Sequence, residues 1–82
     1  MKIPVIRQFV QTTTPEQLAA TLEVLEAFCE FRCVHENEID VAGELITNIC
    51  GALEVHQMIK DGAAETAALN RFGQKVMGSI DR

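Results

Sequence analysis

The sequence predicts an all-α protein, a compact bundle of a short N-terminal helix and three longer amphipathic helices. Apolar residues recur at helical spacings from Pro15 to Arg82, and almost none of the chain alternates as a strand does. Start and stop signals for helices divide this pattern into separate segments. The chain has 82 residues, the length of one domain, so we treat residues 1–82 as a single helical unit.

The first predicted helix is Ile3–Gln11. Pro4 falls in its first turn, where the missing N–H has no helical partner to lose. Its apolar and polar residues separate onto two sides as they do on a helix. These are Val5, Ile6, Phe9 and Val10 against Arg7, Gln8 and Gln11. A strand would need alternation, which the segment lacks.

The second predicted helix begins after Thr14 and extends to about Cys33. Thr14, Pro15 and Gln17 form a Thr-x-x-Gln capping box with proline at the first helical position. One apolar stripe contains Leu18, Leu22, Leu25 and Cys29, and a second contains Val24, Phe28 and Phe31. Two stripes cover more of the helix than one neighbouring helix needs. The second stripe must therefore meet another partner.

The third predicted helix begins at a cap formed by Asn37 and extends to about Lys60. Gly62 follows and can take the left-handed conformation that closes a helix. Its apolar arc contains Ile39, Val41, Ala42, Leu45, Ile46, Ile49, Ala52, Leu53 and Ile59, with Asp40, Glu44, Thr47, Gly51 and Glu54 on the solvent side.

The last predicted helix runs from Ala64 to about Ile80. We expect it to bury Leu69, Phe72, Val76 and Ile80, and to expose Asn70, Arg71, Gln74 and Lys75.

Charge and composition exclude several classes of protein. The net charge is −5, and Arg32 is the single base between Gln11 and Ile59. Nucleic-acid binding needs a clustered basic face, so we expect no nucleic-acid partner. No apolar run approaches the roughly 20 residues that span a bilayer, so we expect no membrane partner. The odd count of 3 cysteines and the lack of a signal-peptide pattern favour the cytoplasm.

The cysteines and His56 are the candidates for chemistry. Cys29 and Cys33, four apart on the predicted helix, would be neighbours there, but a C-x-x-x-C spacing lacks the redox and zinc patterns. We expect Cys29 and Cys50 to pack as small apolar residues and Cys33 to be accessible. His56 falls on the apolar face of the third helix, so we expect it inside the bundle or an interface with a hydrogen-bond partner.

No other pattern points to a reaction. The chain contains no Glu-x-x-His pair of the kind that bundle di-iron sites use, and no glycine-rich phosphate loop. Ser79 is the single serine, which leaves little for a serine nucleophile mechanism. We therefore expect no catalytic residue, metal ligand or cofactor, and a protein that is not an enzyme.

Several strings in the chain carry a family resemblance. They are Lys2-Ile3-Pro4-Val5-Ile6-Arg7, Leu22-Glu23-Val24-Leu25-Glu26-Ala27, Gly43-Glu44-Leu45-Ile46-Thr47-Asn48, Gly51-Ala52-Leu53-Glu54-Val55-His56 and Val76-Met77-Gly78-Ser79-Ile80-Asp81. With these strings the chain resembles a small uncharacterised family from Bacteroidetes-type bacteria. The resemblance spans nearly the whole chain and implies no activity and no site residues.

The leading hypothesis is a non-enzymatic helical protein that forms a homodimer and binds another protein. It depends on the surplus apolar surface, because a bundle this small rarely stabilises itself well without disulfides, metal or association. The predicted interface contains Val24, Phe28, Phe31, Leu45, Ile49 and His56. The alternative is a thiol-redox or metal-responsive accessory protein that uses Cys33 with Cys29 or His56.

Overall fold

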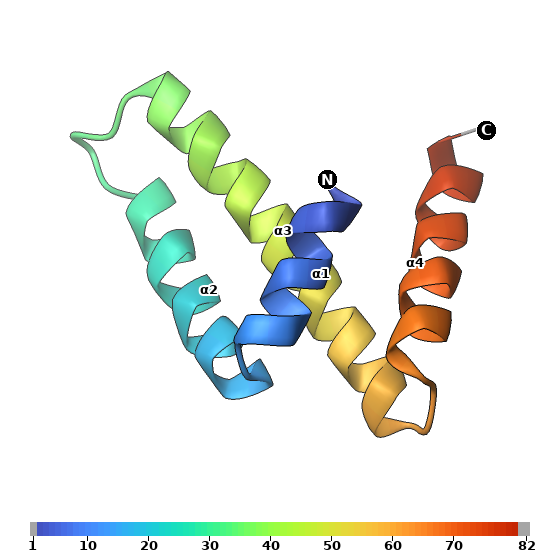
Figure 1. Ribbon diagram of the computed structural model, residues 1–82. Coiled ribbons are helices and arrows are strands. Elements are labelled where there is room, and N and C mark those ends of the chain that lie inside the picture. The colour runs from blue at the N-terminus through green and yellow to red at the C-terminus, as the bar shows by residue number, and fades with distance from the viewer. Residues whose placement is uncertain (1, 81–82) are drawn as a thin grey trace.

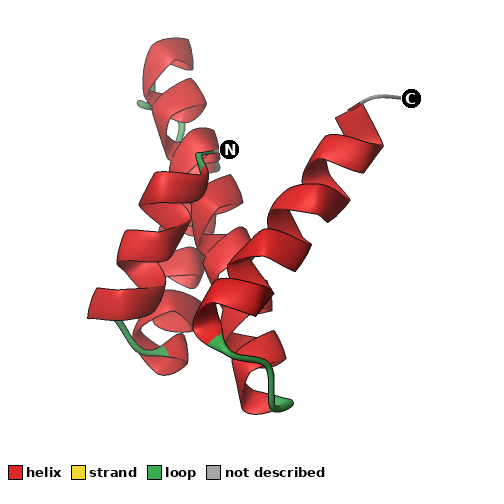
Figure 2. Cartoon of the chain, turned by 45° about the vertical axis from the view of Figure 1, so that its right-hand side comes forward, coloured by secondary structure: helices red, strands yellow, loops and turns green. Residues whose placement is uncertain are grey.

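The structure is a computed structural model that describes residues 2–80, with side chains for residues 2–76. The chain forms four helices, α1 (Ile3–Thr12), α2 (Pro15–Cys29), α3 (Glu36–Lys60) and α4 (Glu65–Ile80). Residues 2–80 contain no strand, as Figure 2 shows. The predicted all-α class is therefore confirmed.

α3 is the central helix of the bundle and contacts each of the other three helices, while α1 also contacts α4 (Figure 1). α2 and α3 run antiparallel and form a helical hairpin. The C-terminal half of α4 leans away from the other helices in both views (Figures 1 and 2). The radius of gyration is 13.7 Å, against about 12 Å for a compact domain of this length. The predicted bundle of four helices is therefore confirmed, in a somewhat extended form.

The core lies where α1, α2 and α4 meet the C-terminal half of α3. Its buried apolar residues are Ile6, Leu18, Ile49, Ala52, Val55, Ala68, Leu69 and Phe72. The predicted burial of Leu69 and Phe72 is confirmed, Val76 is half-buried, and the side chain of Ile80 lies outside the described residues. Outside the core, an ion pair between Lys75 and Glu54 joins α4 to α3.

Gly51 sits in this core, and its predicted place on the solvent side of α3 is wrong. A Cβ at this position would lie 2.8 Å from Ile6 Cδ1 and 3.0 Å from Phe72 Cζ. The missing side chain lets α1 and α4 approach the backbone of α3 closely. By contrast, a Cβ on Gly43, earlier in the same helix, would meet nothing within 4 Å.

A buried amide fixes the start of α1 on α3. Asn48 is 3% exposed, and its Oδ1 accepts a hydrogen bond of 2.9 Å from the backbone N–H of Lys2. This bond satisfies one of the N–H groups that the first turn of a helix leaves without a partner. The Lys2 ammonium lies 3.7 Å from the Glu44 carboxylate beside it.

The predicted helix ends are partly confirmed. The capping box of α2 is present, with Gln17 N–H donating to Thr14 Oγ1 at 3.1 Å and Thr14 N–H donating to Gln17 Oε1 at 3.0 Å. Gly62 has a φ of 111° and follows the end of α3, as expected. α4 begins at Glu65, one residue after the predicted start.

The connection between α2 and α3 differs from the prediction. α2 ends at Cys29, well before the predicted end near Cys33. Phe31 N–H bonds to Phe28 O at 3.1 Å in a tightened turn, and the Phe31 ring packs edge-on against Phe28 with centroids 6.2 Å apart. α3 is capped by His35 instead of Asn37, because the Glu38 carboxylate accepts from His35 N–H at 3.0 Å.

Candidate interaction surface

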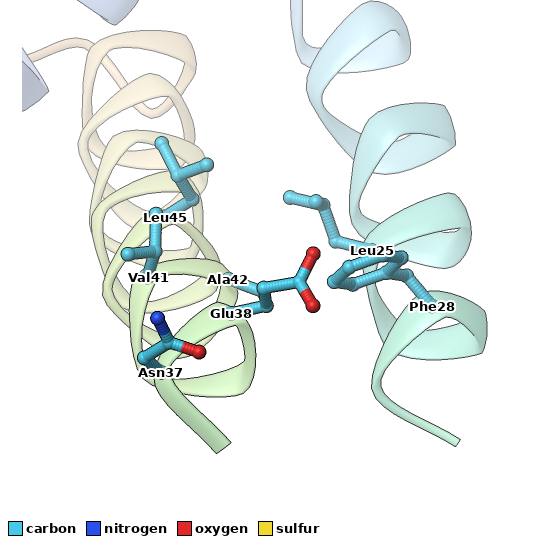
Figure 3. Close-up of a pocket in the computed structure, with 7 residues that line it drawn as sticks. All are labelled: Leu25, Phe28, Asn37, Glu38, Val41, Ala42 and Leu45. Carbon is cyan, nitrogen blue, oxygen red and sulfur yellow. The ribbon is translucent and has the colours of Figure 1, made fainter. Parts of the chain in front are cut away.

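An open, mostly apolar groove lies in the α2–α3 hairpin (Figure 3). Its volume is about 390 Å³, and it lies between the C-terminal half of α2 and the N-terminal half of α3. Its lining is mostly apolar and consists of Leu25, Phe28, Asn37, Glu38, Val41, Ala42 and Leu45. Glu38 supplies the one carboxylate of this lining. We call this groove the hairpin hollow.

The hairpin hollow is open because the N-terminal half of α3 has fewer neighbouring helices than the C-terminal half. α3 has 25 residues and is roughly 37 Å long at 1.5 Å per residue, while α1 with 10 residues reaches about 15 Å. Between Glu36 and Thr47 only Ala42 is buried, whereas five residues are buried from Asn48 onward. α1 and α4 thus cover mainly the later half of α3, and the earlier half packs on α2 with only the start of α1 beside it.

A second hollow lies on the other side of the exposed side chains of Val41 and Leu45. It has a volume of about 210 Å³ and is lined by Lys2, Val5, Val41, Glu44, Leu45 and Asn48. We call it the α1 hollow. Both hollows share Val41 and Leu45, so these two residues form a ridge between them. We call the ridge and its two hollows together the ridge face.

The ridge is exposed to an unusual degree for large apolar residues. Val41 is 62% exposed and Leu45 is 39% exposed. Together with half-buried Val5, Leu25 and Phe28 they form one contiguous apolar surface. Contiguous apolar patches of this kind, rimmed by polar residues, mark interaction sites on soluble proteins.

The six residues predicted for an interface lie in different parts of the structure. Phe28 and Leu45 line the hairpin hollow. Val24 on α2 and Phe31 in the connection are 68% and 55% exposed. Ile49 is 2% exposed and packs in the core of the monomer.

His56 lies far from the hairpin hollow, beside the start of α2. It is half-buried and lines a separate cavity of about 410 Å³ with Pro15, Glu16, Leu53, Gln57 and Lys60. Its Nε2 atom is buried without a hydrogen-bond partner among the described residues. The expected partner for this imidazole is thus not found in the monomer.

The structure separates the residues of the thiol and metal alternative. Cys33 is exposed in the connection, so it does not share a helical surface with Cys29, and that prediction is wrong. His56 lies 20 residues after Glu36 on α3, about 30 Å from the connection. Cys50 is exposed, which corrects its predicted packing role. Within the described part of the chain, no three His, Cys, Asp or Glu residues are grouped to hold a metal ion.

The sequence did not predict that Lys2, Val5 and Glu38 belong to the ridge face. It placed Val41 in the apolar arc of the third helix without assigning it to an interface. One feature of the sequence could have indicated this surface. Val41 and Leu45 are large apolar residues on a helix whose apolar arc is wider than the neighbouring helices can cover. Which of those residues stay exposed depends on where α1 and α4 dock. Among the described helices, none is long and apolar enough to cross a membrane.

The chain matches the model of a family of unknown function, DUF6952, over residues 1–81, and therefore belongs to that family. The predicted membership of an uncharacterised family is confirmed at this level. No curated protein and no solved structure matches the chain.

Proposed function

We propose that this member of a family of unknown function is a non-enzymatic interaction protein that pairs with a second copy of itself through the ridge face. The observation that carries the proposal is the exposed Val41–Leu45 ridge between two hollows, on the half of α3 that buries the fewest residues in the monomer. Burial of apolar area favours association by about 25 cal/mol per Å² before the costs of association are subtracted.

The shape of the hairpin suits a second hairpin as its partner. At the first turns of α3, the bundle consists of α2 and α3, and the start of α1 reaches this half of α3 only beside Val41, Glu44 and Leu45. Helical domains bury their apolar stripes by packing two layers around one core. Two hairpins related by a two-fold axis would make an antiparallel four-helix bundle, with Leu25, Phe28, Val41 and Leu45 of both copies in its centre.

The size of the protein supports the same proposal. A chain of 82 residues buries only about 60% of the surface that its unfolded form exposes, and small bundles usually gain stability by association. The proposal places this assembly in the cytoplasm, on the basis of the odd number of cysteines. Another protein that offers an apolar helix could occupy the same face in place of the second copy.

A pair of variants tests the proposed surface. Val41→Asp places a charge on the ridge, and Ile39→Asp is the matched control on the same helix. Ile39 is 37% exposed and lines neither hollow. By sedimentation velocity we expect Val41→Asp to be a folded monomer and Ile39→Asp to associate as the unmodified protein does. Equal association of both variants would move the interface away from the ridge.

A further inference from the structure

We infer that a cavity between α1 and α4 binds a small zwitterion, a molecule that carries both an ammonium group and a carboxylate. We call it the α1–α4 cavity, and its volume is about 220 Å³. Its lining consists of Arg7, Gln11, Glu65, Thr66, Leu69 and Asn70. None of these residues lines the hairpin hollow or the α1 hollow. The inference therefore goes beyond the proposed pairing and is tested separately from it.

Two pairs of polar side chains form the walls of the α1–α4 cavity. Arg7 and Gln11 are four residues apart on α1, and Thr66 and Asn70 are four residues apart on α4. Residues at this spacing are neighbours on one face of a helix. The two helices are in contact, and helices in contact usually turn their apolar stripes toward each other. Here Leu69, 5% exposed, is the one large apolar residue of the lining.

The polar side chains of the two walls do not satisfy one another. Within the described part of the chain, no ion pair joins Arg7 to Glu65, and no hydrogen bond joins the side chains of α1 to those of α4 across the cavity. Side chains that only closed a contact between two helices would be expected to pair in this way. Polar groups that converge on one cavity without such pairing are typical of ligand-binding sites.

Glu65 gives an independent indication that a ligand is bound. Its Oε1 atom is buried and has no hydrogen-bond partner among the described residues. A carboxylate oxygen withdrawn from water is costly unless a donor reaches it. An ionised carboxylate only accepts hydrogen bonds, and charged donors give the strongest of them. Glu65 is the one acidic residue of the lining, so an ammonium group in the cavity is placed to supply the missing donor.

Arg7 determines what the other end of the ligand must carry. It is the one basic residue of the lining and is exposed on α1. Its guanidinium group presents a planar fork of N–H donors that matches a carboxylate. A ligand with a single charge would satisfy either Arg7 or Glu65, whereas a zwitterion satisfies both. The chemistry of the two side chains therefore favours a zwitterion.

The volume of the α1–α4 cavity limits the size of the ligand. Drug-sized molecules occupy sites of about 300–1,000 Å³, and this cavity is smaller. At the ~30 Å³ that a water molecule occupies in the liquid, its volume of about 220 Å³ corresponds to roughly seven non-hydrogen atoms. A free amino acid with a short side chain has this size and carries both charges.

A titration followed by NMR tests the site in the whole protein. L-alanine and β-alanine are the zwitterionic probes, and they differ in the spacing between their two charges. Propionate and ethylamine each keep one charge of alanine. We expect one of the amino acids to shift the backbone amide signals of Leu69 and Asn70 in a saturable way. We expect the probes with a single charge to bind at least about tenfold more weakly. No saturable shift with either amino acid, or equally tight binding of a singly charged probe, would overturn the inference.

Charge-removing variants identify the two side chains that hold the ligand. We expect Arg7→Gln and Glu65→Gln each to weaken binding of the zwitterion by about tenfold, with circular dichroism spectra like that of the unmodified protein. Arg71→Gln is the matched control, because Arg71 is exposed on α4 and lines none of the cavities described above. Equal binding by all three variants would contradict the site.

A double variant distinguishes a ligand site from an ion pair within the protein. If Arg7 and Glu65 paired with each other in solution, the stability losses of Arg7→Gln and Glu65→Gln would not add in the double variant. We expect additive losses in urea unfolding without ligand, and non-additive losses would overturn the inference. The mass of the protein in solution does not enter this test, so its outcome is independent of the proposed pairing.

Discussion

The two halves of α3 are one continuous helix in two different environments. From Asn48 onward, α3 is enclosed by the other three helices and buries Ile49, Ala52 and Val55. Before Asn48, it packs on α2 and presents Val41 and Leu45 to solvent. Both halves are apolar, so hydrophobicity alone does not separate core from surface. The later half stabilises the monomer, and we propose that the earlier half receives a partner.

The largest expected difference between the halves concerns Ile49 and Leu45, four residues apart on α3. Ile49 is 2% exposed and Leu45 is 39% exposed. Ile49→Ala should lower the free energy of unfolding by about 2–5 kcal/mol, because it leaves a cavity in the core. Leu45→Ala should lower it by less than about 1 kcal/mol, since its side chain already meets solvent.

Urea unfolding in the Val41→Asp background measures both effects without a contribution from self-association. Similar losses for the two variants would show that the two halves of α3 are equally well packed in the monomer.

Smaller effects on stability are expected when each of the two glycines of α3 is replaced by alanine, and these two effects have opposite signs. Gly51→Ala places a methyl group against Ile6 and Phe72 in the core, where overpacking typically costs about 1–3 kcal/mol. Gly43→Ala meets nothing within 4 Å and should stabilise the helix by about 0.5–1 kcal/mol. Thermal unfolding gives both values, and a stabilising Gly51→Ala would mean that α1 and α4 do not approach α3 as closely as described.

The smallest of these effects lies outside α3, at the cap of α2. Thr14→Ala removes the acceptor of the Gln17 N–H bond and should lower the free energy of unfolding by about 1 kcal/mol. Thr14→Ser keeps a hydroxyl acceptor and serves as the control. A Thr14→Ala variant that melts at the same temperature as the control would show that this cap does not hold the helix that supports the hairpin hollow.

Local signals in the sequence predicted much of the fold. Thr14 and Gln17 predicted the start of α2, and Gly62 predicted the end of α3, because caps depend on neighbouring residues. The end of α2 was missed because Phe31 leaves the helix and packs on Phe28, which is a contact between side chains that a helical period does not express. Gly51 was misplaced because a glycine looks the same in sequence whether it faces solvent or a close neighbour.

The candidate surface was less predictable than the fold. Phe28 and Leu45 were recognised because their apolar stripes exceed what a neighbouring helix can cover. Ile49 belongs to the same arc as Leu45 and could not be distinguished from it, since its burial depends on which half of α3 receives α1 and α4. Lys2 comes to the surface beside Val41 only because the Asn48 amide fixes the start of α1 there.

The mass of the protein in solution tests the central claim most directly. Size-exclusion chromatography with light scattering measures it over a range of protein concentrations. One chain has a mass of 9.1 kDa, so the proposed pairing predicts about 18 kDa at micromolar concentrations, with a shift toward one chain on dilution. A folded protein that stays at the mass of one chain up to high micromolar concentration would contradict the proposed dimer and the role given to the Val41–Leu45 ridge.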